Sequence, residues 1–192
     1  MERDYYKKSI QNGLSGKAEH TAIARKVYLS YPTFSFSNHP EQEFSVKNAI
    51  AIKFDVDIFS IHFAGSAKTG ESYHKDSVFV PGKSDLDAAI ISPSLFLQYL
   101  ELTCEITDNF SDMTKFTGSQ QDAVRFKKYL TRGIFVPELM PHSVAKLDWN
   151  SFFNNLSQGN LELFDNINCW IYSTQKIFEL KFSKTIQLLE EK

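Results

Sequence analysis

Two short stretches, Phe63-Ala64-Gly65-Ser66 and Ser84-Asp85-Leu86-Asp87-Ala88-Ala89-Ile90, decide how this chain is expected to fold. The first closes an apolar run over residues 58–64, and the second opens another over residues 86–91. Short apolar runs bounded by turn residues are typical of buried strands. A polar, turn-forming segment, residues 68–83, lies between them. We therefore expect two neighbouring strands, each carrying polar residues at one end.

The second stretch places two carboxylates two residues apart. Side chains of a strand alternate between its faces, so Asp85 and Asp87 are expected on one side and Leu86 in the core. Carboxylates held this close repel each other unless a cation lies between them. Hard oxygen ligands suit Mg²⁺ or Mn²⁺. The spacing therefore predicts a divalent metal site at Asp85 and Asp87.

The first stretch offers a place for phosphates. Gly65 lacks a side chain, so backbone N–H groups can approach a polyphosphate, and Ser66 adds a hydroxyl donor at the same turn. Lys68 and Ser84 are further candidates for the phosphate site, although lysines in loops are usually only solvated. Metal and phosphates are expected to meet in one cleft.

Gly65-Ser66 followed by Ser84-Asp85-Leu86-Asp87 resembles the signature of the DNA polymerase β-like nucleotidyltransferase superfamily, a Gly-Ser turn and then an Asp-x-Asp strand. The resemblance implies that Asp85 and Asp87 are catalytic metal ligands. It further implies that Gly65 and Ser66 bind the phosphates of an NTP or dNTP, whose NMP group passes to an acceptor. Small stand-alone proteins with this motif are often toxin–antitoxin or phage-defence components, and the resemblance implies such a context here.

The chain departs from this pattern in two ways. Asp85 follows Gly65 by 20 positions, a longer connection than compact members usually have, and an inserted loop over residues 71–82 would explain it. Active members also usually carry a third carboxylate on a further strand. Asp148 and Glu179 are the candidates, but Asp148 suits a helix cap or first turn and Glu179 lies in a helical pattern.

The remaining periodicity predicts an α/β (α+β) fold, a small mixed sheet of the polymerase β-like nucleotidyltransferase type surrounded by helices. Helices are expected at about residues 41–54, 95–103, 120–131 and 174–190, with two more over 4–31 and a short one near Phe152, and a last strand is possible at 167–172. We expect a single domain over residues 1–192. It would comprise a helical N-terminal extension (1–54), a motif-bearing core (55–110) and a helical C-terminal part (111–192).

Composition narrows the function classes. With 21 basic and 23 acidic residues the net charge is −2, which gives no global field for nucleic acid. Arg125, Lys127 and Lys128 could form a basic wall, but charges on a helix face are routine. The isolated thiols Cys104 and Cys169 suit a reducing compartment. We expect a cytoplasmic protein with no membrane association, because the N-terminus is charged and long apolar stretches are missing.

Three functions stay open at this point. The first is an Mg²⁺- or Mn²⁺-dependent nucleotidyltransferase whose acceptor is a protein, a nucleic-acid end or another nucleotide. The second is a catalytically degenerate module that lacks the third carboxylate and binds a nucleotide or a protein partner. The third is a structural or adaptor protein in which the motif is a coincidence.

Overall fold

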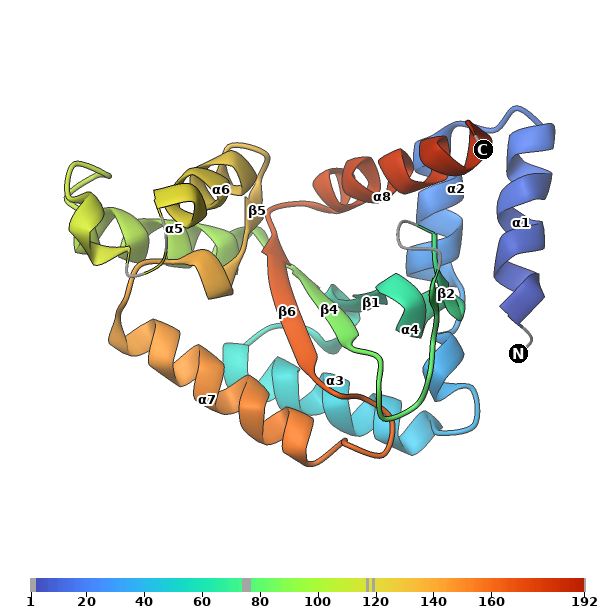
Figure 1. Ribbon diagram of the computed structural model, residues 1–192, viewed down its shortest axis with the longest axis horizontal. Helices are drawn as coiled ribbons and strands as arrows, with labels where there is room; N and C mark the ends of the chain where they lie inside the picture. Colours follow the sequence, from blue (N-terminus) through green and yellow to red (C-terminus); the bar gives the residue numbers. More distant parts are fainter. Residues whose placement is uncertain (1–2, 74–76, 117, 119, 192) are drawn as a thin grey trace.

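A four-stranded mixed sheet stands at the centre of the computed structural model, which describes residues 3–73, 77–116, 118 and 120–191. The strand order is β1-β4-β6-β5. β4 runs antiparallel to β1 and parallel to β6, and β5 runs antiparallel to β6. The bounds are β1 Ile61–Ala64, β4 Leu86–Ile91, β5 Ile134–Phe135 and β6 Ile167–Tyr172. The α/β class expected from the sequence is confirmed (Figure 1).

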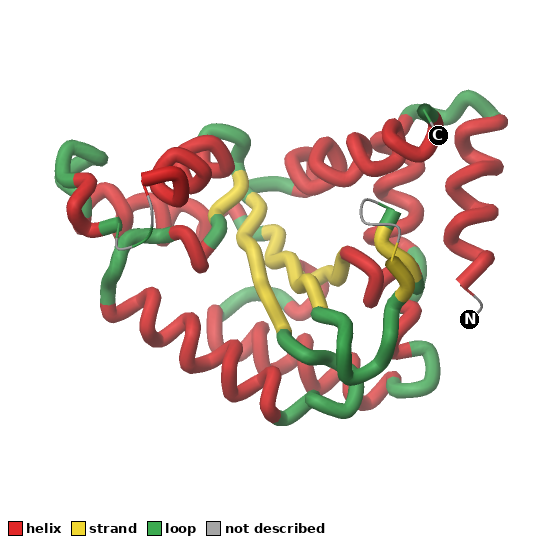
Figure 2. Tube along the Cα trace, in the orientation of Figure 1, coloured by secondary structure: helices red, strands yellow, loops and turns green. Residues whose placement is uncertain are grey.

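The two faces of the sheet bury different sets of side chains, as the alternation along a strand requires. One face, with Leu86, Ile90 and Ile171, contributes to a large aromatic and aliphatic core. The other face, with Ala89 and Tyr172, packs into a second hydrophobic cluster. Helices therefore cover the sheet on both sides (Figure 2).

Most of the helical residues in the first core come from α3 (Pro40–Phe54), α5 (Pro93–Ile106), α6 (Gln120–Leu130) and α7 (Val144–Gln158). Their starts follow local chemistry, since α3 and α5 each begin with a proline, whose fixed φ suits a first helical turn. The hydroxyl of Ser143 accepts a hydrogen bond from the Lys146 amide and caps α7. α7 is longer than the short helix expected near Phe152.

The second cluster is formed by α1 (Arg3–Ser15), α2 (His20–Ala24), the π-helical turn Arg25–Ser30 that continues α2, and α8 (Gln175–Glu190). α8 packs along α2. His20 Nε2 and Glu190 Oε2, 2.8 Å apart, join the start of α2 to the end of α8. No helix in the described ranges is long and apolar enough to cross a membrane.

The region around the motif differs from expectation in two details. Residues 58–60 form a 3₁₀ turn, so the strand expected over 58–64 is confined to Ile61–Ala64, and Phe59 is 88% exposed. The expected loop over 71–82 contains the paired strands β2 (Glu71–Ser72) and β3 (Ser77–Val78). A one-turn helix, α4 (Gly65–Thr69), follows β1. Further 3₁₀ turns occur at Phe34–Phe36, Met113–Lys115 and Pro137–Leu139.

Candidate functional site

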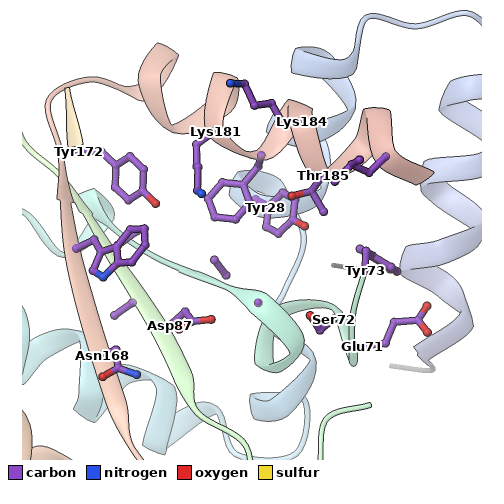
Figure 3. Close-up of a pocket in the computed structure, with 17 residues that line it drawn as sticks. Tyr28, Glu71, Ser72, Tyr73, Asp87, Asn168, Tyr172, Lys181, Lys184 and Thr185 are labelled. Atoms are coloured by element: carbon purple, nitrogen blue, oxygen red, sulfur yellow. The ribbon is translucent and has the colours of Figure 1, made fainter. Parts of the chain in front are cut away.

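The sheet brings the end of β1 and the beginnings of β4 and β6 to one edge. Ala64, the last residue of β1, pairs with Asp87 on β4, and Asp87 pairs with Asn168 on β6. The next residue after Ala64 is Gly65. Figure 3 shows Asp87 and Asn168 on neighbouring strands, at the floor of a cavity. The glycine of the first motif and an acid of the second therefore meet.

Gly65 and Asp87 fit closely together. Gly65 has a φ of +65°, a backbone conformation that side chains disfavour. A Cβ built on Gly65 would overlap Oδ2 of Asp87. The position therefore needs glycine for two reasons, its backbone angle and the carboxylate that fills the space beside it.

The two acids of the Asp-x-Asp motif are placed differently with respect to β4. Leu86 is fully buried, and Asp85 and Asp87 on either side of it are exposed. Asp87 lies in the strand and lines the cavity. Asp85 precedes the strand by one residue and is not among the lining residues. Asp87 is therefore the carboxylate around which a site can be built.

The cavity has a volume of about 400 Å³ and lies between the sheet and α8. This volume falls in the range of small-molecule sites. Its floor is formed by β4 and β6, its roof by α8, and its side by Tyr28 of the π-helical turn and by β2 (Figure 3). Its polar and aromatic lining includes Tyr28, Ser72, Asp87, Asn168, Trp170, Tyr172, Lys181, Lys184 and Thr185.

Three residues expected at the phosphate site do not line this cavity. Lys68 is 3% exposed, and its ammonium donates a hydrogen bond to the carbonyl oxygen of Tyr31. Burial lowers the pKa of Lys68 to about 8. Ser84 Oγ accepts a hydrogen bond from the amide of Val80. Ser66 is half-buried in α4, directly after Gly65. Lys68 and Ser84 thus hold structural positions, and only the Gly65 end of the turn faces the cavity.

The two candidate third carboxylates are engaged elsewhere. Asp148, on α7, lies 2.7 Å from Lys53 Nζ. Glu179, on α8, accepts two hydrogen bonds from Arg25, at 2.6 and 2.7 Å, and these bonds are the main reason why the pKa of Glu179 is lowered. Neither residue lines the cavity. The structure therefore does not bring Asp148 or Glu179 to Asp87.

Asn168 occupies the position beside Asp87 on the next strand. Its Oδ1 accepts a hydrogen bond of 2.8 Å from Asn166 Nδ2. Asn168 is not among the site residues predicted from the sequence, because it carries an amide and the predicted third ligand was a carboxylate. The polar residue between Ile167 and Cys169, inside the expected strand 167–172, was the signal that could have identified it.

A second acid lies near Asp87 outside the sheet. Glu138, in the 3₁₀ turn Pro137–Leu139, is exposed as a residue, but its carboxyl group is crowded by protein. This burial raises the pKa of Glu138, the charge of Asp87 raises it further, and a hydrogen bond with Trp170 lowers it. Across the described residues, no group of three or more His, Cys, Asp or Glu side chains is arranged to hold a metal. Among the residues that line the cavity at this edge, Asp87 and the amide oxygen of Asn168 are the oxygen donors that a cation could use.

α8 supplies basic groups that the sequence motif did not reveal. Lys181 Nζ lies 5.8 Å from the ring centroids of both Trp170 and Tyr129. Burial lowers the pKa of Lys181, and the neighbouring charges of Arg132 and Lys184 lower it further. A lysine within a helical pattern forms no recognisable motif. Only the packing of α8 over the sheet shows that Lys181 reaches into the cavity and that the exposed Lys184 lines it.

Other residues considered from the sequence lie away from the cavity. Arg125 pairs with Asp122 on the surface of α6, and Lys127 lies over the ring of Phe110. Cys104 and Cys169 are free thiols, and burial raises the pKa of Cys169 well above its usual value. These observations leave the α6 charges and both cysteines without a part in the site.

Comparison of the chain with protein-family models, with curated proteins and with solved structures gave no match.

Proposed function

We propose that this protein is a metal-dependent nucleotidyltransferase that transfers an NMP group from an NTP or dNTP to an acceptor. The observation that carries the proposal is the contact between Gly65 and the Asp87 carboxylate at the edge of a cavity roofed by lysines. It joins the Gly-Ser turn to the Asp-x-Asp strand, which is the combination that the resemblance to the polymerase β-like superfamily requires.

The oxygen donors at this edge fit Mg²⁺ or Mn²⁺. Asp87 supplies a carboxylate, and Asn168 on the neighbouring strand carries an amide oxygen, which also accepts a hydrogen bond from Asn166. Asp85, two residues before Asp87 and outside the cavity lining, is the second carboxylate of the motif. Hard divalent cations prefer such oxygen ligands. When bound, such an ion neutralises charge on the phosphates and on the departing pyrophosphate.

The rest of the cavity suits the other parts of a nucleotide. Gly65 lines the cavity at the start of α4, and the Asp87 carboxylate fills the space that a side chain there would need. Trp170, Tyr172 and Tyr28 provide aromatic surface against which a base or sugar can pack. In this proposal the metal ion binds at the edge formed by Asp87 and Asn168, where the reaction takes place, and the aromatic rings bind the base or sugar.

A second function is favoured by one observation, the neutral amide of Asn168. The resemblance implies a third carboxylate on a further strand in active enzymes, and a carboxylate can accept a proton from an attacking hydroxyl whereas an amide cannot. A protein with Asn168 in this place could bind a nucleotide without transferring it. This alternative is a nucleotide-binding or protein-interaction module built on the same site.

The biological setting belongs to the same proposal. Two free thiols suit the reducing interior of a cell, so we place the reaction in the cytoplasm. A role in phage defence or as part of a toxin–antitoxin pair, with a protein as partner or acceptor, is the context that the resemblance suggests.

The test is incubation of the purified protein with Mg²⁺ or Mn²⁺ and each labelled NTP and dNTP. The wild type is compared with Asp87→Asn, and with Asp148→Asn as a matched control, because Asp148 is a surface acid outside the cavity. We expect metal-dependent product and pyrophosphate from the wild type and the control but not from Asp87→Asn. Nucleotide binding without pyrophosphate release would favour the second function. If the protein neither binds nucleotide nor releases pyrophosphate, the result would favour a structural or adaptor protein.

A further inference from the structure

One end of the cavity collects positive charge. Lys181 and Lys184 line it from α8, and Arg132 is close enough that its charge, like that of Lys184, lowers the pKa of Lys181. In the part of the chain that the structure describes, no ion pair joins Lys181 or Lys184 to a carboxylate. Like charges held together in a half-buried setting repel each other, and a bound anion would relieve the repulsion.

Aromatic rings hold the Lys181 ammonium at this place. Trp170 and Tyr129 lie with their ring centroids 5.2 Å apart, and Lys181 Nζ is 5.8 Å from each. A cation over an aromatic face is attracted by the ring, but the ring cannot neutralise its charge. Figure 3 shows Lys181 reaching from α8 into the cavity, above the strands that carry Asp87 and Asn168. The ammonium is thus available to a ligand.

The helix that carries these lysines is fixed to the rest of the fold. Glu179 is buried and binds Arg25 of the π-helical turn through two hydrogen bonds. The ring of Phe182 packs on Tyr28, with centroids 4.4 Å apart. α8 therefore holds Lys181 in a defined position in the cavity, which is what a preorganised anion site requires, and the exposed Lys184 lines the same cavity one turn further along α8.

We propose that Lys181 and Lys184 form the binding site for the triphosphate of the nucleotide, between α8 and the edge formed by Asp87 and Asn168. Its assignment to a nucleotide triphosphate rests on the proposed function. Lysine ammonium groups bind phosphate oxygens through charge-assisted hydrogen bonds. The cavity therefore selects ligands by the number of their phosphates, and a triphosphate binds more tightly than a diphosphate or a monophosphate.

Calorimetric titration with inorganic tripolyphosphate in the absence of metal tests this site alone. The proteins are the wild type, Lys181→Gln, Lys184→Gln and the control Lys176→Gln, which removes a lysine of α8 outside the cavity. We expect the wild type and the control to bind alike, and Lys181→Gln to bind about tenfold more weakly or worse. Lys184→Gln should weaken binding in the same direction, and because Lys184 is exposed its loss leaves the fold intact.

Trp170 offers a second readout, because it lines the cavity while the other tryptophan, Trp149, is buried in the main core. Tripolyphosphate should change the tryptophan fluorescence of the wild type but not of Trp170→Phe. Equal tripolyphosphate binding by wild type, Lys181→Gln and Lys184→Gln, or no binding by any of them, would overturn the inference. Nucleotide transfer that survives both lysine substitutions would overturn it while leaving the proposed function in place. Lysine-dependent tripolyphosphate binding in a protein that transfers no nucleotide would support the inference and refute the proposed transferase.

Discussion

The carboxylate of Asp87 occupies the space that a side chain on Gly65 would need. The two residues come from different strands, and their contact exists because Ala64 and Asp87 are paired across β1 and β4. This close fit makes the strand end sensitive to any side chain at position 65.

Gly65→Ala should therefore damage both stability and ligand binding. The φ of +65° and the overlap with Asp87 each oppose a Cβ, and we expect a loss of about 1–3 kcal/mol in the free energy of unfolding. Urea denaturation measures the loss. Gly159→Ala is the control, because its Cβ would meet its nearest neighbour at an ordinary 3.7 Å. Equal stability of Gly65→Ala and wild type would show that the Asp87 carboxylate does not hold this position in solution.

Asn168→Asp should strengthen metal binding. The substitution keeps an oxygen that can accept the hydrogen bond from Asn166, and it places a new carboxylate beside Asp87. Without metal the added charge repels Asp87, and with Mg²⁺ the repulsion becomes attraction to the ion. We expect the Tm to fall without metal and to rise with Mg²⁺ by more than in the wild type. Asn154→Asp, on the exposed side of α7, should show neither effect.

The same Asn168→Asp variant separates the two proposed functions. If the native protein lacks turnover because of the amide, the new carboxylate should produce or raise metal-dependent pyrophosphate release. If the native protein already transfers nucleotides, the gain should be small.

Much of the secondary structure could be predicted because its signals are local. Pro40 and Pro93 mark the starts of α3 and α5, and the apolar runs at 86–91 and 167–172 correspond to β4 and β6. The turn at residues 58–60 was missed because an apolar run does not show that Phe59 faces solvent.

The composition of the site could be predicted only in part. Gly65 and Asp87 belong to a motif that the sequence displays. Asn168 lies beside Asp87 because β4 and β6 pair in parallel, and Lys181 lies in the cavity because α8 packs over the sheet. Neither relationship has a signal within a short window of sequence. Lys68 looked accessible in a polar segment, but the fold buries it against Tyr31.

The ion pair between Arg25 and Glu179 should stabilise the protein and make that stability depend on pH. Arg25→Gln removes two of the hydrogen bonds to the buried Glu179 carboxylate and leaves the one from Gln175, so we expect a lower free energy of unfolding at neutral pH, measured by urea denaturation. The folded pKa of Glu179 is lowered, mainly by the hydrogen bonds from Arg25. The stabilisation is therefore complete above the unfolded pKa and is lost as the pH falls through the folded pKa. At pH 3 the difference between Arg25→Gln and wild type should shrink, and a constant difference would argue against this pair.

His62 should oppose stability in mild acid. Burial lowers the pKa of His62 to about 4, with smaller contributions from Lys47 and Lys68. The unfolded chain takes up a proton near pH 6.5 and the folded protein does not, so the free energy of unfolding should fall between about pH 6.5 and pH 4. His62→Gln should lose this part of the pH dependence, as seen by denaturation at several pH values. NMR titration of the His62 imidazole in the native protein should give a midpoint well below pH 6.5. A midpoint near pH 6.5 would contradict the claim that burial lowers the pKa of His62.

The most direct test of the central claim, a divalent cation and a nucleotide held at Asp87, is titration of Mn²⁺ followed by electron paramagnetic resonance. The titration is performed with each NTP, on the wild type and on Asp87→Asn. We predict that the wild type binds Mn²⁺ together with at least one NTP and that Asp87→Asn binds the pair at least about tenfold more weakly. Equal binding by the two proteins, or no binding by the wild type with any nucleotide, would contradict the account.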